Sequence, residues 1–188
     1  MERVVLFLDY ANINRTAADR GYALDYGHLL NYLSEGRFLV EAYCYLPINP
    51  RTPYAGDRDI EALWSQGYLV CTKTGTVVSD SYKCNFDVEI TLDMMRVAHE
   101  VQPDIMVLAS GDGDFVPLML ELRKQGIRVE VAAFPENTAR GMILKSSGFI
   151  DLDVYCQQAC ADTEATPEEI TVADYPVPEA SVFAERKP

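Results

Sequence analysis

The sequence predicts an α/β fold, a three-layer sandwich in which helices cover both faces of a central parallel β-sheet. Short runs of apolar and β-branched residues alternate along the chain with segments whose apolar residues recur every three or four positions. The first run, Val4–Leu8, is apolar throughout, as expected of a strand that is covered on both faces. A chain of 188 residues is long enough for one such domain with a tail.

The first half of the chain alternates between predicted strands and predicted helices. Strands are expected at Val4–Leu8, Phe38–Leu46 and Tyr68–Thr72, and helices at Leu24–Ser34 and Asp57–Gln66. Both helices place their apolar residues on one face, and Pro47 and Pro50 are expected to end the second strand. The polar stretch from Gly75 to Asn85 is interpreted as a loop.

The second half continues the alternation and sets the predicted strand order. Further helices are expected at Asp87–Glu100, Phe115–Gln125 and Thr138–Lys145, and further strands at Asp104–Ala109, Ile127–Ala133 and Phe149–Leu152. A chain that winds outward from its first strand and then returns to the other side gives the order 3-2-1-4-5. In this order, a crevice opens between the first and fourth strands.

The periodic pattern ends near residue 158. Residues 159–188 contain four prolines, several acidic residues and few apolar ones, which indicates a disordered tail. We therefore divide the chain into a folded domain, residues 1–158, and an acidic tail, residues 159–188.

The composition excludes some classes of protein. The net charge of −13 argues against a protein that coats nucleic acid through bulk electrostatics, because phosphate binding needs a basic surface. It does not exclude an enzyme that meets nucleic acid through divalent cations. The sequence has no membrane-length apolar run and no export signal, and its five cysteines are scattered. These features favour reduced thiols in the cytoplasm and no contact with a membrane.

Acidic residues stand where predicted strands end or a predicted helix begins. Asp9 ends the first strand, and Asp112 and Asp114 follow the fourth. Asp87 opens the long helix that leads into the fourth strand, and Asp93 lies six residues deeper in it. Ligands of open parallel sheets bind beyond the carboxyl ends of the strands, where the strand order reverses. Asp9, Asp87 and Asp112 are therefore expected to share one crevice, with Asp93 about 9 Å further along its helix axis.

Converging carboxylates predict a metal site. Several negative charges in one crevice are unfavourable unless a cation or protons intervene, and oxygen ligands suit Mg²⁺ or Mn²⁺. Such ions support hydrolysis of phosphodiesters. Each acid also has a structural explanation: a turn at Asp9, a favourable helix dipole at Asp87, and an N-cap at Asp114. Their joint placement favours the metal site.

Three segments carry a resemblance to a known family. They are Phe7-Leu8-Asp9-Tyr10-Ala11-Asn12, Lys83-Cys84-Asn85-Phe86-Asp87 and Ser110-Gly111-Asp112-Gly113-Asp114-Phe115. In this order they resemble the NYN domains of the PIN-like nuclease superfamily, most of all the LabA-like branch, over about residues 1–155. Two positions depart from the family pattern: Cys84 replaces a common Gly, and Ser147 stands where an Asp is expected.

The resemblance implies a PIN-like (Rossmann-like) fold and a Mg²⁺- or Mn²⁺-dependent endoribonuclease that acts on single-stranded RNA. It implies that Asp9, Asp87 and Asp112 are the catalytic, metal-binding acids and that Asp114 is a further ligand. Supporting roles fall to Asn12, Lys83, Ser110 and Asp93. Lys83 and Ser110 match positions whose expected work is phosphate contact and loop geometry.

Two other functions remain open. The chain could be a non-catalytic regulatory module that keeps the PIN-like fold and binds a protein partner through its acidic tail. It could also be a phosphotransfer enzyme with Asp9 as nucleophile, although Ala11 stands where the haloacid-type phosphatases need a second Asp. A homodimer is compatible with every one of these functions.

Overall fold

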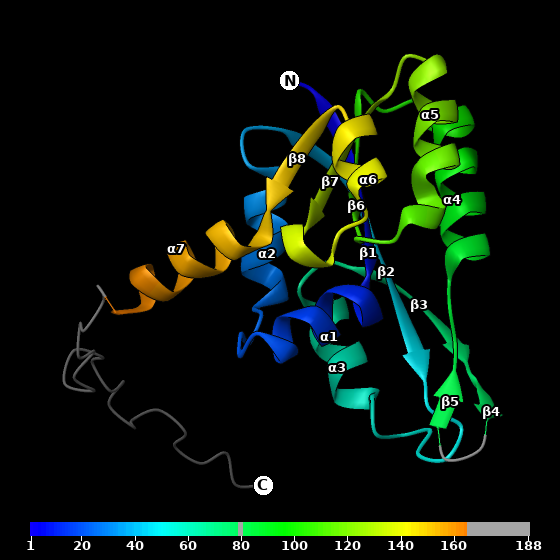
Figure 1. The fold of residues 1–188 in the computed structure, drawn as a ribbon, viewed down its shortest axis with the longest axis vertical. Helices are drawn as coiled ribbons and strands as arrows, with labels where there is room; N and C mark the ends of the chain where they lie inside the picture. Colours follow the sequence, from blue (N-terminus) through cyan, green and yellow to red (C-terminus); the bar gives the residue numbers. More distant parts are fainter. Residues whose placement is uncertain (79–80, 165–188) are drawn as a thin grey trace, which may run out of the picture.

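The computed structural model describes residues 1–78 and 81–164 and is built around a parallel six-stranded sheet in the order β3-β2-β1-β6-β7-β8 (Figure 1). The strands are β1 (Arg3–Asp9), β2 (Phe38–Ile48), β3 (Leu69–Thr74), β6 (Ile105–Ala109), β7 (Arg128–Ala133) and β8 (Gly148–Asp151). Its first five strands follow the predicted order, and β8 adds a short edge beyond them. Strand β1 is central, and its residues Val4–Leu8 are all buried, as a strand covered on both faces requires.

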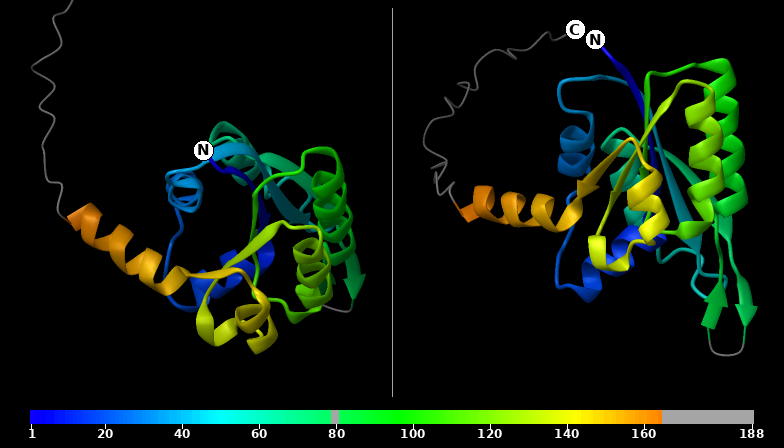
Figure 2. Two further views of the ribbon diagram at one scale, coloured as in Figure 1. Left: turned by 90° about the horizontal axis from the view of Figure 1, so that it is seen from above. Right: turned by 45° about the horizontal axis from the view of Figure 1, so that its top comes forward.

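Helices cover both faces of the sheet, which confirms the three-layer α/β fold (Figures 1 and 2). They are α1 (Tyr10–Asp19), α2 (Tyr26–Ser34), α3 (Asp57–Ser65), α4 (Asp87–Glu100), α5 (Val116–Lys124), α6 (Arg140–Lys145) and α7 (Leu152–Glu164). Helices α4 and α5 lie together on one face, while α1, α2 and α3 lie on the other. No helix in the described ranges is long and apolar enough to cross a membrane.

Helix α1 follows β1 directly and was not expected from the sequence. Asp9 ends the strand and also caps the helix, since its Oδ1 accepts a hydrogen bond from the Asn12 backbone N–H at 3.2 Å. Ile13, Thr16 and Ala17 are the buried residues of α1, and their spacing of three or four positions marks its inner face. The strand-to-helix transition at a single residue fixes the direction of the Asp9 side chain.

The stretch from Gly75 to Asn85, predicted to be a loop, contains a short antiparallel hairpin. Strands β4 (Thr76–Val78) and β5 (Ser81–Lys83) pair with each other and stand apart from the main sheet (Figure 1). The loop prediction was therefore wrong. Strands of three residues whose side chains are exposed show no apolar alternation, which is the signal that strand prediction uses.

Helix α7 corrects the predicted domain boundary at residue 158. The helix runs from Leu152 to Glu164, so residues 159–164 continue a regular element and are not part of a disordered tail. Tyr155 and Cys156 are buried, and the Tyr155 ring lies 4.9 Å from the ring of Tyr32 on α2. The rest of the predicted tail, 165–188, lies outside the described residues.

Arg20, just after α1, connects α7 to the rest of the domain through ion pairs. Its guanidinium lies 2.9 Å from Asp153 on α7 and 3.0 Å from Glu136 in the 3₁₀ turn Pro135–Asn137. The same guanidinium lies over the ring of Phe134, 5.3 Å from its centroid. Only 21% of the Arg20 side chain is exposed, so these interactions are partly shielded from water.

We expect Arg20→Ala to lower the free energy of unfolding by about 1–3 kcal/mol, because Asp153 loses its charged partner in a half-buried position. Thermal unfolding followed by circular dichroism measures the change. Arg128→Ala is the matched control, since its ion pair with Glu2 is about half exposed on both sides and is worth only about 0–1 kcal/mol. Equal losses in the two variants would refute the role given to Arg20.

Candidate metal centre

The register of the central strands brings two motifs side by side. In the parallel pair of β1 and β6, Leu8 is paired with Ala109, so the next residues, Asp9 and Ser110, lie side by side at the carboxyl ends of the two strands. The Ser110 hydroxyl donates a 3.2 Å hydrogen bond to Asp9 Oδ2. Strands β1 and β6, between which the crevice is predicted, are neighbours in the sheet.

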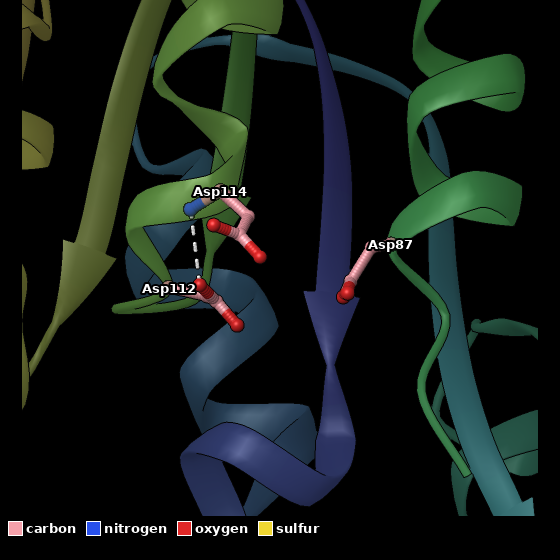
Figure 3. A group of neighbouring side chains, drawn as sticks. All are labelled: Asp87, Asp112 and Asp114. Carbon is pink, nitrogen blue, oxygen red and sulfur yellow. Dashed lines mark hydrogen bonds between the residues drawn. The ribbon is translucent and has the colours of Figure 1, made fainter.

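Three carboxylates converge near the carboxyl ends of β1 and β6. One oxygen from each of Asp87, Asp112 and Asp114 lies within 4.8 Å of the other two. Asp112 and Asp114 come from the turn after β6, and Asp87 comes from the first turn of α4, on the opposite side (Figure 3). Their side chains point toward the space between the two elements. Two of the predicted catalytic acids, Asp87 and Asp112, thus meet together with the predicted further ligand.

Hydrogen bonds within the Ser110–Asp114 loop hold Asp112 and Asp114 in place. Asp112 Oδ1 accepts from the Asp114 backbone N–H at 3.0 Å, and Ser110 Oγ accepts from the Asp112 backbone N–H at 3.2 Å. A Cβ at Gly111 would lie 2.7 Å from the carbonyl oxygen of Asn137, so only glycine allows this close approach. In the Ser110–Asp114 loop, close packing therefore explains the glycine at position 111, and the hydrogen bonds and carboxylates explain the aspartates.

Asp9 is not one of the three converging carboxylates. Its Oδ1 caps α1, its Oδ2 accepts from Ser110, and it is half-buried. Among the described residues, the group of three or more possible metal ligands within 4.8 Å of one another consists of Asp87, Asp112 and Asp114 and does not include Asp9. The expected role of Asp9 as a central ligand stays a prediction, and Asp114 is the third acid of the converging group. Hydrogen bonds to both Asp9 oxygens also weigh against Asp9 as a nucleophile.

Two asparagines support the acids. The Asn12 side-chain oxygen accepts from the Gly111 backbone N–H at 3.1 Å and so connects α1 to the Ser110–Asp114 loop, in agreement with its predicted supporting role. Asn85 Nδ2 donates to Asp87 Oδ2 at 2.8 Å. The sequence interpretation missed Asn85, which it treated only as part of the segment that leads to Asp87.

The other two predicted supporting residues lie elsewhere. Asp93 accepts from the Tyr45 hydroxyl at 2.9 Å and pairs with Arg96 at 2.6 Å, so it belongs to the packing of α4 against β2. Lys83 ends β5 and lines a cleft beside the hairpin. Neither residue is part of the converging carboxylates. The greater distance predicted for Asp93 agrees with this placement.

Burial and mutual repulsion raise the pKa of two acids. Burial is the largest cause of the raised pKa of Asp9, and the charges of Asp87 and Asp112 raise it further, against the hydrogen bonds from Asn12 and Ser110. Burial also raises the pKa of Asp87, with added repulsion from Asp112 and Asp114. The cluster therefore carries excess negative charge that a cation would compensate.

The donor set fits Mg²⁺ or Mn²⁺. All three converging groups are carboxylates, and hard divalent cations prefer oxygen ligands. Octahedral coordination at about 2.1 Å places adjacent ligand oxygens about 3.0 Å apart and opposite ones about 4.2 Å apart. The three carboxylate oxygens, which lie within 4.8 Å of one another, would therefore have to move closer together by side-chain rotation to hold such an ion.

The comparison with protein families matches residues 3–153 to the NYN domain. The chain belongs to the NYN domain family. This family is part of the PIN-like nuclease superfamily, and the match spans all three motifs that suggested the resemblance. A curated relative from Synechococcus elongatus, "Low amplitude and bright protein LabA", is 31% identical over 160 residues, which cover 80% of this chain and 84% of the relative.

A solved structure supports the same fold. The crystal structure of a protein of unknown function from Vibrio parahaemolyticus superposes with a TM-score of 0.69 and 24% identity, covering 81% of this NYN chain and 93% of the other chain. At this identity, the likeness concerns the fold. The α/β architecture and the family thus agree with the expectation from the sequence.

Proposed function

We propose that this NYN protein is a divalent-metal-dependent endoribonuclease that hydrolyses single-stranded RNA. The observation that carries the proposal is the convergence of Asp87, Asp112 and Asp114 within 4.8 Å at the carboxyl ends of β1 and β6. Membership of a nuclease superfamily supports the reaction class. Neither histidine of the chain, His28 on α2 or His99 in the last turn of α4, belongs to the converging group.

The residues have distinct roles in this proposal. Asp87, Asp112 and Asp114 hold Mg²⁺ or Mn²⁺, and the ion supplies Lewis-acid chemistry to a phosphodiester. Asp9 is a positioning residue that acts through Ser110. It accepts a hydrogen bond from the Ser110 hydroxyl, and the same hydroxyl oxygen accepts a hydrogen bond from the Asp112 backbone N–H. Asn85 orients Asp87 through its 2.8 Å hydrogen bond.

The test is cleavage of a labelled single-stranded RNA by the purified wild-type chain in Mn²⁺, in Mg²⁺ and in EDTA. We expect cleavage in the presence of either ion and none in EDTA. A single-stranded DNA of the same sequence serves as the substrate control. Absence of cleavage with both ions would contradict the proposal and favour a non-catalytic regulatory module that keeps the fold.

A further inference from the structure

Two clefts beside the acidic cluster share two side chains. The first, the hairpin cleft, has a volume of about 680 Å³ and lies between β3, β4, β5 and α1. The second, the tyrosine cleft, has a volume of about 380 Å³ and lies between α1, the end of β2 and the segment before α3. Arg15 and Tyr82 line both, so the clefts adjoin each other at these two side chains, and together they are called the path.

The path adjoins the acidic cluster at two points. Asn85 lines the hairpin cleft and donates a hydrogen bond to Asp87. Tyr10 lines the tyrosine cleft and follows Asp9 directly in the chain. Each cleft therefore has a lining residue directly beside an acid of the site, and a strand that occupied both clefts would lie next to the acidic cluster.

The hairpin cleft is basic in a chain whose net charge is −13. Arg15, Lys73 and Lys83 line it, and none of its lining residues is acidic. Lys73 is engaged by Glu89, whose carboxylate lies 2.6 Å away. Arg15 and Lys83 are exposed and form no ion pair among the described residues, which leaves two positive charges available to phosphates.

The tyrosine cleft has the composition of a nucleobase site. Its walls combine the rings of Tyr10 and Tyr82 with the apolar side chains of Leu46 and Ile48. Asp59 adds a carboxylate that can accept hydrogen bonds from a base edge. Single-stranded RNA is recognised by stacking of unpaired bases on aromatic rings and on arginine, with hydrogen bonds to their edges.

The position of Tyr82 is fixed by the hairpin. A Cβ at Gly75 would lie 2.5 Å from Tyr82 Cδ2, so the tyrosine ring packs directly on the glycine backbone. The Gly75 backbone N–H also donates to the Ile48 carbonyl at 2.9 Å, which ties the hairpin to the end of β2. The packing on Gly75 therefore fixes the position of Tyr82 relative to the end of β2.

We infer that this path binds single-stranded RNA, with phosphates on Arg15 and Lys83 in the hairpin cleft and one base against Tyr82 in the tyrosine cleft. The inference rests on the proposed ribonuclease function and adds to it the binding surface and the residue that sets the cleavage position. Tyr82 is a positioning residue: the base that stacks on it determines which phosphodiester reaches Asp87, Asp112 and Asp114. The hairpin is then the element that makes cleavage site-specific.

The test begins with binding in EDTA, where a labelled single-stranded RNA is not cleaved. Fluorescence anisotropy at several salt concentrations gives the Kd and its salt dependence. We expect Tyr82→Ala to weaken binding by about 5- to 150-fold and Tyr82→Phe to keep most of the affinity. Lys83→Ala and Arg15→Ala should each reduce the slope of log K against log salt by about 0.7. Lys124→Ala, which removes an exposed lysine on α5, should leave both unchanged.

Cleavage in Mn²⁺ then separates this inference from the function on which it rests. We expect Tyr82→Ala to spread the cleavage positions over several bonds and Tyr82→Phe to restore the wild-type pattern. If the Tyr82, Lys83 and Arg15 variants bind and cut as the wild type does, the inferred path is wrong while the ribonuclease function stands. If the wild type binds RNA through these residues but does not cut, the path stands and the ribonuclease proposal is wrong. No binding by the wild type would overturn the inferred path.

Discussion

Asp112→Asn is expected to lower the rate of RNA cleavage in Mn²⁺ by more than about 100-fold, and Asp87→Asn to do the same. Mutating a residue that hydrogen-bonds to a metal ligand lowers activity or metal affinity by about 10- to 100-fold, so loss of a ligand itself should lower the rate further. Each Asn keeps the shape of the side chain and its hydrogen bonds from Asp114 or Asn85. The measurement is the initial rate on a fixed single-stranded RNA at saturating Mn²⁺.

Asp93→Asn is the matched control on the same helix as Asp87. Asp93 contacts Tyr45 and Arg96 instead of the converging acids, so its replacement should change the cleavage rate by less than about threefold. Equal cleavage by the wild type and by Asp112→Asn would mean that the activity comes from a contaminant or from another site. An equal loss in Asp93→Asn would show that any change in α4 disturbs the site.

The second large effect is expected on thermal stability. Mn²⁺ at about 100 times its Kd should add about 2.7 kcal/mol, because the ion binds only the folded chain. For a chain of this length, that corresponds to a Tm higher by about 5–11 °C. Asp87→Asn should remove most of this increase. Calorimetry in Mn²⁺ and in EDTA gives both values, and an increase that survives in Asp87→Asn would argue against the site.

Without metal, the same substitution should stabilise the protein at neutral pH. Because the pKa of Asp87 is raised in the folded state above its ordinary 3.8, its ionisation costs folding energy as the pH rises through the raised value. In EDTA at pH 7, Asp87→Asn should therefore unfold at a higher temperature than the wild type. The difference should shrink as the pH falls through the raised value and disappear well below 3.8, where the wild-type carboxyl is protonated in both the folded and the unfolded state. A lower Tm for the variant at pH 7 would contradict the repulsion described for the cluster.

Much of the fold follows from local patterns of the sequence. Long runs such as Val4–Leu8 and the periodic helix Asp87–Glu100 bury apolar side chains regularly, so their type and their limits are predictable. The hairpin and α1 were missed for different reasons. The side chains of β4 in the hairpin are exposed, and α1 begins directly after Asp9, a residue that ends a strand and caps a helix at once.

The site was predictable as a neighbourhood and not as a coordination set. Strand order and the rule for ligand binding at strand ends placed Asp9, Asp87 and Asp112 in one crevice. Which acids converge depends on hydrogen bonds that no spacing reveals. The Ser110 hydroxyl donates a hydrogen bond to Asp9, while the 3₁₀ turn that begins at Gly113 places Asp114 beside Asp112. In the proposed function, the contact with Ser110 makes Asp9 a residue that positions the loop instead of a ligand of the ion.

The most direct test of the metal centre is a crystal of the wild-type chain grown in Mn²⁺ and measured at the manganese absorption edge. The account predicts an anomalous difference peak between Asp87, Asp112 and Asp114, with each contributing an oxygen within about 2.3 Å of the ion. Asp9 should remain on Ser110 in that structure. No peak between these three carboxylates at saturating Mn²⁺, or a peak held elsewhere in the chain, would contradict the account.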